Sequence, residues 1–172
     1  MTVRPLRVAF AIALIVTLVP LQFSVVNRMP FPGAAPDLLV LAVVAVALVR
    51  GPDVGLVFGF TTGLVADLAP PADHTLGRLA LAYALAGYVG GLLSDDAARS
   101  AFLPLGVVAL GAIVAEGTFT IVGALLGDER ITAVALAHNV PSSVLYDVLL
   151  APFVIPLVGA VSRRLVVDPS RS

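Results

Sequence analysis

Six long apolar runs, separated by short polar breaks, constrain the fold of this chain more than any other feature. Each run holds 14 to 25 residues with few charges, and a helix of roughly 20 apolar residues crosses the hydrocarbon core of a bilayer. Because backbone groups in lipid must bond within their own segment, helices are favoured. We therefore predict an all-α, six-transmembrane-helix bundle that forms a single integral membrane domain over residues 1–172. The predicted spans are residues 8–26, 36–49, 54–69, 76–93, 102–126 and 141–161.

The second and third predicted spans are short, at 14 and 16 residues. At a rise of about 1.5 Å per residue they would cover roughly 21–24 Å, which is less than the ~30 Å of a typical hydrocarbon core. We expect either that these helices extend into the corner at residues 50–53 or that the bilayer thins there.

The composition agrees with a chain that faces lipid. Charged residues make up 12% of the sequence and hydrophobic residues 59%, with a mean hydropathy of +1.06, whereas a soluble domain carries roughly 25% charged residues. The net charge of −1 argues against a nucleic-acid partner. Because the sequence has no cysteine, it offers neither a disulfide framework nor a thiolate metal site.

The arginines predict the orientation of the bundle. Arg4 and Arg7 precede the first apolar run as in a signal peptide, but no small-x-small cleavage site follows it, so we expect a retained first span. With six spans, both termini share a side that carries seven of the ten arginines, and the positive-inside rule places that side in the cytoplasm. The seven are Arg4, Arg7, Arg50, Arg99, Arg163, Arg164 and Arg171.

Small residues at helical spacing mark the third and fourth predicted spans. Gly55, Gly59 and Gly63 follow one another at spacing four, and the fourth span answers with Gly87 and Gly91. Membrane helices associate where small residues let their backbones approach closely. We expect these glycines to pack the two helices together, and a docking face for another membrane protein is the alternative. Gly123-x-x-x-Gly127 in the fifth span has the same two interpretations.

Three carboxylates and one arginine are predicted to lie in or at the edge of the spans. Charges within a membrane are costly, so they face the bundle interior and indicate function by default. Asp67 is expected either to reach the outer headgroup region or to pair with Arg78. Glu116 is predicted to lie deepest in the membrane, near the centre of the fifth span. We expect it to be a protonated or hydrogen-bonded packing residue, and a partner contact or a polar cavity is the alternative. Asp147 is expected to bond to an adjacent helix.

The sequence shows no recognisable catalytic or metal-binding motif. His74 and His138 have no companions at metal-ligand spacing, and a metal site needs three or four converging ligands. Ser142-Ser143, His138 and Asp147 lie close in sequence, and we interpret this as coincidence. The string Asp95–Arg99 resembles half of the aspartate set of phosphoalcohol transferases, and we expect a solvated turn in which Asp96 caps a short helix. We therefore predict a non-enzyme without cofactor or metal.

Five short motifs follow one another between residues 36 and 164. They are Pro36-Asp37-Leu38-Leu39, Arg50-Gly51-Pro52, the segment from Gly59-Phe60 through Gly63-Leu64 to Asp67-Leu68, the segment from Leu76-Gly77 through Ala80-Leu81 and Tyr83 to Gly87-Tyr88, and the segment from Pro141-Ser142 through Tyr146 and Ala151-Pro152 to Arg163-Arg164. In this order and spacing the chain resembles the MreD family of rod shape-determining membrane proteins. Two residues depart from the pattern: Asp147 stands where Asn is expected, and Arg78 adds a charge.

The resemblance implies a six-helix fold similar to the substrate-binding subunits of energy-coupling-factor vitamin transporters. It also implies a non-catalytic role in the bacterial cell-elongation machinery, in the plasma membrane, that supports cell shape and lateral peptidoglycan synthesis. The implied partners are MreC and, indirectly, MreB, RodA and a penicillin-binding transpeptidase. A substrate-binding transporter subunit is the alternative, although such a site wants convergent polar and aromatic groups and the chain has no tryptophan and three tyrosines.

Overall fold

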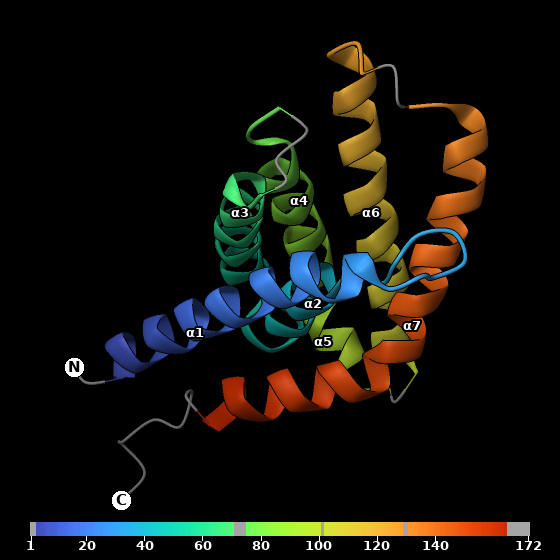
Figure 1. Cartoon of the computed structure of the whole chain (residues 1–172). Helices are drawn as coiled ribbons and strands as arrows, with labels where there is room; N and C mark the ends of the chain where they lie inside the picture. The colour runs from blue at the N-terminus through green and yellow to red at the C-terminus, as the bar shows by residue number, and fades with distance from the viewer. Residues whose placement is uncertain (1–2, 71–74, 101, 129–130, 165–172) are drawn as a thin grey trace, which may run out of the picture.

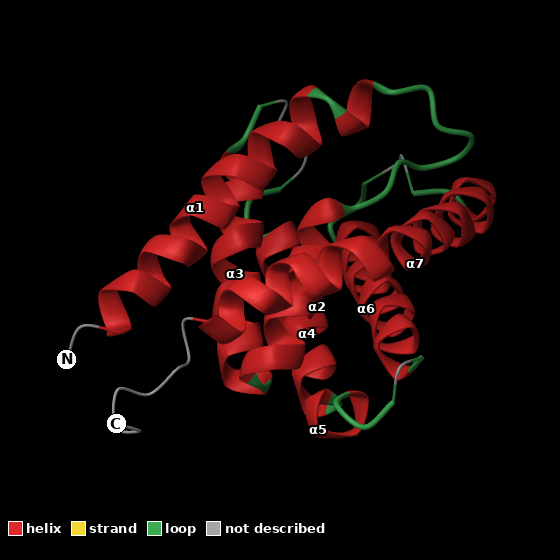
Figure 2. Cartoon of the chain, turned by 90° about the horizontal axis from the view of Figure 1, so that it is seen from below, coloured by secondary structure: helices red, strands yellow, loops and turns green. Residues whose placement is uncertain are grey.

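The chain folds into helices joined by short connections. The computed structural model describes residues 3–70, 75–100, 102–128 and 131–164, and in these ranges it contains seven α-helices, one short 3₁₀ helix and no strand (Figure 2). The all-α prediction is confirmed. The elements are α1 (Val3–Ser24), η1 (Val26–Arg28), α2 (Leu38–Arg50), α3 (Pro52–Leu68), α4 (Arg78–Leu92), α5 (Ser94–Ala97), α6 (Leu103–Leu125) and α7 (Ala133–Arg164).

Three of the described helical segments are long and apolar enough to cross a membrane. They are Leu6–Arg28, Leu103–Leu125 and Leu136–Ser162, and Leu38–Arg50 and Arg78–Leu92 are shorter apolar helices. The chain therefore has the character of a membrane protein, as its composition predicts. The six-span count remains a prediction, because α2, α3 and α4 have only 13, 17 and 15 residues.

The connection between α2 and α3, the two short predicted spans, is very short. α3 begins at Pro52, two residues before the predicted span, so that only Gly51 separates it from α2. Gly51 has a φ of 84°, which favours glycine, and Pro52 opens α3 with the fixed φ of a first helical position. The helices therefore extend into this corner, as one of the two alternatives expected.

The core of the fold is α2. Its residues from Leu39 to Ala47 are all buried, and it contacts α1, α3, α4, α6 and α7. A helix that is apolar on every side is either surrounded by other elements or faces lipid. Here neighbouring helices surround it, and the valines and alanines of α2 leave room for their close approach. In Figure 1, α3, α4 and α6 stand beside one another, while α1 runs across them at a steep angle.

The predicted glycine positions lie in the contact between α3 and α4. A Cβ added at Gly59 or at Gly63 would overlap the carbonyl oxygen of Tyr83 or of Leu79, respectively. Gly55 and Gly87 lie against each other's backbone. Gly91, the fifth predicted position, lies against the backbone of Pro52. All five glycines are thus occupied by packing within the chain, and their close-packed faces are not open to a partner.

The last helix differs from the prediction in its start. The span was predicted to begin at Pro141, whereas α7 begins at Ala133 and contains Pro141, Pro152 and Pro156 in its interior. A proline has no N–H group to donate a helical hydrogen bond, so it disturbs the helix locally. Membrane helices tolerate this because neighbouring groups form hydrogen bonds with the backbone carbonyl that is left without a donor. The helix changes direction part-way along its length (Figure 1), as expected for a helix with interior prolines.

Candidate functional site

The clearest group of polar side chains is a buried junction where four helices meet. We call it the polar junction and define it by Gln22, Asp37, Tyr83 and Asp147, which come from α1, the start of α2, α4 and α7. Three of these side chains are almost fully buried, and Asp37 is partly buried. Because buried polar groups need partners, the bonds within the junction determine what it can do.

Asp37 is the centre of the polar junction. One carboxylate oxygen accepts from the N–H groups of Leu39 and Val40 at 2.9 and 3.1 Å, which caps the N-terminus of α2. The other oxygen accepts from the hydroxyl of Tyr83 at 2.7 Å. A single aspartate therefore fixes the start of the central helix and ties it to α4.

Asp147 joins α7 to the same point. Its side chain is fully buried, and Oδ1 accepts from the backbone N–H of Asp37 at 2.7 Å. This is the bond to an adjacent helix that the sequence predicted, made at the residue that caps α2. Oδ2 is buried with no hydrogen-bond partner among the described residues. An asparagine here, as in the family pattern, could present a donor in place of that oxygen.

Gln22 connects α1 to the polar junction, and it is not among the residues predicted from the sequence. Its Nε2 donates to Asn27 Oδ1 at 2.8 Å and to the carbonyl oxygen of Pro36 at 2.9 Å, while its Oε1 accepts from the N–H of Leu38 at 3.0 Å. A lone amide inside an apolar run was the available signal, since a buried polar side chain must find partners.

The connection between α1 and α2 is also held on α7 by residues of the last of the five sequence motifs. Ser142 Oγ accepts from the N–H of Ala34 at 3.0 Å, and the hydroxyl of Tyr146 donates to the carbonyl oxygen of Pro32 at 3.3 Å. The rings of Phe31 and Tyr146 are 5.4 Å apart between centroids, which suits an aromatic pair. These motif residues therefore fasten one segment of the chain to another.

Glu116 lies near the polar junction but is not the most buried acid. It is half-buried on α6, close enough to Asp37 and Asp147 for the three charges to interact. Asp67 and Asp147 are 2% and 0% exposed, respectively. Glu116 is thus less buried within the protein than either aspartate, whereas its depth in the membrane, which its central place in the run predicts, stays a prediction. Within the described ranges, no three histidine or acidic side chains are arranged to hold a metal ion.

A second polar group fixes the start of α4. The carboxylate of Asp67 accepts from the backbone N–H groups of Gly77, Leu79 and Ala80 at 2.8, 3.1 and 3.1 Å. The predicted ion pair with Arg78 is not observed, because Arg78 pairs with Asp128, and the side chain of Asp67 is buried within the protein. The reason is that α4 starts without a capping side chain of its own, so its unpaired N–H groups recruit the nearest carboxylate.

Arg78 instead ties α4 to the C-terminal end of α6. It is 4% exposed and forms an ion pair with Asp128 at 2.7 Å. Its Nε donates to the carbonyl oxygen of Phe119 at 2.7 Å, and its Cζ lies 3.7 Å from the centroid of the Phe119 ring. A Cβ at Gly123 would overlap the guanidinium. Gly123 therefore leaves the space that the guanidinium occupies.

The remaining catalytic candidates do not converge. Ser142 Oγ contacts the carbonyl oxygens of His138 and Asn139, not an imidazole, and Asp147 is engaged by Asp37. His74 lies outside the described residues. These contacts leave no nucleophile–base arrangement among the described members of the predicted set.

In the string Asp95–Arg99, at the short helix α5, every residue except the buried Ala97 is exposed. The expected short helix is present, but its N-terminus has no side-chain cap, so the predicted capping role of Asp96 was wrong. Asp96 lies inside the first turn of α5, not at the capping position before it. A carboxylate in the first turn still interacts favourably with the helix dipole.

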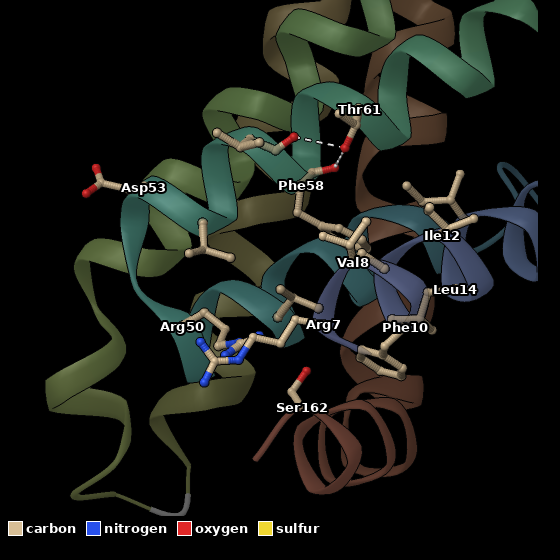
Figure 3. A pocket seen from close by; sticks show the side chains of 15 residues that line it. Arg7, Val8, Phe10, Ile12, Leu14, Arg50, Asp53, Phe58, Thr61 and Ser162 are labelled. Carbon is tan, nitrogen blue, oxygen red and sulfur yellow. Dashed lines mark hydrogen bonds between the residues drawn. The ribbon is translucent and has the colours of Figure 1, made fainter. Parts of the chain in front are cut away.

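One pocket of about 730 Å³ lies away from the polar junction, between α1, α2, α3 and the end of α7 (Figure 3). Its wall is mostly apolar, with Arg7 and Arg50 at one end (Figure 3). Comparison with known proteins gives no match: no family model, no curated protein and no solved structure is significantly similar to this chain. Function must therefore be argued from the residues themselves.

Proposed function

We propose that this chain is a non-catalytic integral membrane component of the bacterial cell-elongation machinery, of the MreD type. One observation carries the proposal. The residues on which the resemblance rests are the ones that join the helices: Asp37, Tyr83, Ser142 and Tyr146, from three separate motifs, meet around the start of α2. This arrangement suits a protein whose motif residues hold a shape that a partner recognises.

The proposed topology places α1, α2, α3, α4, α6 and α7 across the plasma membrane, in a bundle similar to the substrate-binding subunits of energy-coupling-factor transporters. Both termini then lie in the cytoplasm with most of the arginines. A reporter enzyme fused after Arg164 tests this topology, and a periplasmic signal would refute the six-span count.

The proposed direct partner is MreC, bound in the plane of the membrane, with MreB, RodA and a penicillin-binding transpeptidase as indirect partners. Because the close-packed glycine faces are occupied inside the bundle, the contact must use the exposed apolar faces. Val16 on α1, Ile121 on α6 and Leu149 on α7 are 64%, 62% and 59% exposed, and such faces contact either lipid or a membrane partner.

Depletion in a rod-shaped host tests the proposed role. We expect rounding or bulging of the cells, rescue by the wild-type chain, and recovery of MreC with a tagged chain after solubilisation. Normal cell shape, together with no recovery of MreC, would refute the proposal. The control is a tagged membrane protein of similar size, which should recover no MreC.

A transporter subunit is the second candidate, favoured by one observation. The pocket volume of about 730 Å³ falls within the ~300–1,000 Å³ of small-molecule sites. Its wall supplies few polar groups, however, because the hydroxyl of Thr61 is bonded to the carbonyl oxygens of Val57 and Phe58 in its own helix (Figure 3). Loss of vitamin uptake in cells of normal shape would favour this candidate over the first.

A further inference from the structure

We propose that the pocket between α1, α2 and α3 binds an anionic phospholipid, with the phosphate at Arg7 and Arg50 and an acyl chain along the apolar wall. The inference requires that the chain lies in a membrane, and it takes from the proposed topology that the arginine-rich end is cytoplasmic. It is independent of the role in cell elongation, and either proposal can fail without the other.

The charged end of the pocket carries the first part of the argument. Arg7 lies near the start of α1 and Arg50 is the last residue of α2. The two guanidinium groups lie beside each other in Figure 3, close enough for their charges to repel. The carboxylate of Asp53, which also lines the pocket, points away from them (Figure 3). Guanidinium groups bind phosphate with paired hydrogen bonds, so an anion between these two arginines would offset their repulsion.

The apolar wall carries the second part. Apolar side chains from α1 and α3 line the pocket, among them Phe10, Leu14 and Phe58 (Figure 3). Ile15 and Val57 also belong to this lining. Thr61 adds no free donor, since its hydroxyl is bonded to backbone carbonyl oxygens. Apart from the arginines, Asp53 and Ser162, the wall offers a polar solute no side chain with a free polar group, whereas it matches the hydrocarbon of an acyl chain.

The position of the pocket carries the third part. Its outer edge is formed by Val8, Ile12 and Val57, which are 58%, 55% and 59% exposed. In a membrane these side chains face lipid, so the pocket opens sideways to the acyl chains. Arginine clusters at the cytoplasmic surface attract anionic headgroups, and the arginine-rich end of the chain is the one proposed to be cytoplasmic. Charge at one end, hydrocarbon along the wall and a lateral opening together define an anionic phospholipid as the occupant.

Tryptophan fluorescence tests this inference directly, because the chain has no tryptophan of its own. A Val57→Trp variant is reconstituted into phosphatidylcholine vesicles that contain an increasing fraction of either dibrominated phosphatidylglycerol or dibrominated phosphatidylcholine. Bromine quenches a tryptophan that its lipid contacts. The matched control is Ile121→Trp, which places the probe on an exposed face of α6 far from the pocket arginines in sequence.

We expect dibrominated phosphatidylglycerol to quench Val57→Trp at a much lower mole fraction than dibrominated phosphatidylcholine, while Ile121→Trp shows no preference. Each arginine near an anionic surface strengthens binding about fivefold, so Arg7→Gln and Arg50→Gln together should reduce the preference by about 25-fold. Circular dichroism and size-exclusion chromatography check that each variant is folded.

Three outcomes would overturn the inference. The first is equal quenching of Val57→Trp by the two lipids, which needs no arginine variant to interpret. The second is a phosphatidylglycerol preference that survives replacement of both arginines in folded protein. The third is protection of Val57→Trp from both lipids, which would indicate that a second copy or a partner helix fills the pocket.

Discussion

The packing of α3 on α4 predicts that Gly59→Ala destabilises the fold, although alanine is the better helix former. A Cβ at this position would lie 2.6 Å from the carbonyl carbon of Tyr83 and 3.1 Å from the backbone nitrogen of Ala84, and it would overlap the Tyr83 oxygen. These are backbone atoms, so no change of rotamer can relieve the overlap and the helices must move apart. Overpacking of this kind lowers the free energy of unfolding by about 1–3 kcal/mol.

Gly90→Ala is the matched control, because it adds the same methyl group to α4 without the overlap. A Cβ there would lie 3.6 Å from the side chains of Val44 and Val107, which is ordinary van der Waals contact. Replacing a helical glycine by alanine raises stability by about 0.5–1 kcal/mol. This gain is common to both variants and cancels in the comparison, so the free energy of unfolding should differ between them by about 1–3 kcal/mol.

The measurement is reversible unfolding of the purified protein in mixed micelles, with helix content followed by circular dichroism as the fraction of dodecyl sulfate increases. Gly59→Ala should unfold at a lower fraction than Gly90→Ala. If the two variants unfold together, or if Gly59→Ala is the more stable, the close contact between α3 and α4 is not present in the folded protein.

Three further predictions concern the polar side chains and use the same unfolding titration. Asp147→Asn keeps an acceptor for the Asp37 N–H and should leave stability unchanged or raised, whereas Asp147→Leu should lower it by about 1–3 kcal/mol. Tyr83→Phe removes the hydroxyl bond to the Asp37 carboxylate and should lower stability by about 1.5–3 kcal/mol. Asp67→Ala removes the acceptor at the start of α4 and should lower it by about 0.5–2 kcal/mol, with a smaller loss for Asp67→Asn. The observed hydrogen bonds would be contradicted if Asp147→Asn and Asp147→Leu were equally stable, or if Asp67→Ala and Asp67→Asn were. They would also be contradicted if Tyr83→Phe were as stable as the wild type.

The sequence predicts the helices well because lipid leaves the backbone few alternatives. Each predicted apolar run overlaps one observed helix over most of its length, and Gly51-Pro52 marks the corner that separates α2 from α3. The start of α7 at Ala133 could not be predicted by treating Pro141 as a helix start, because the rule that proline ends a helix is weakest in membrane helices. How α1 crosses the bundle depends on packing between distant segments.

The polar sites were harder to predict because their partners are backbone groups distant in sequence. The sequence around Asp67 shows an acidic residue near a loop. The N–H groups that donate to its carboxylate, however, belong to residues 10 to 13 positions later in the chain. Counting the unpaired N–H groups of each predicted helix would have helped, since the start at Gly77 has no side chain that can cap it. The same count at the start of α2 points to Asp37, whose side chain caps its own helix.

Variants of the glycine contact cannot locate the proposed partner surface, because the same glycines hold the fold together. Gly59→Ala should reduce both the folded yield and the recovery of MreC, so a loss of MreC in that variant says nothing about docking. Val16→Ala, Ile121→Ala and Leu149→Ala are suited to the question, because these side chains are more exposed than buried in the chain and their truncation should change the free energy of unfolding by less than about 0.5 kcal/mol.

We expect one of these three variants to lose MreC in the pull-down while unfolding like the wild type. The helix that carries it then forms the docking face, since a stability defect is excluded by the same sample. If all three variants recover MreC normally, and so do their pairwise combinations, the exposed faces of α1, α6 and α7 around these positions contact lipid only. Binding would then have to use another surface, and the proposed contact in the plane of the membrane would be wrong for these helices.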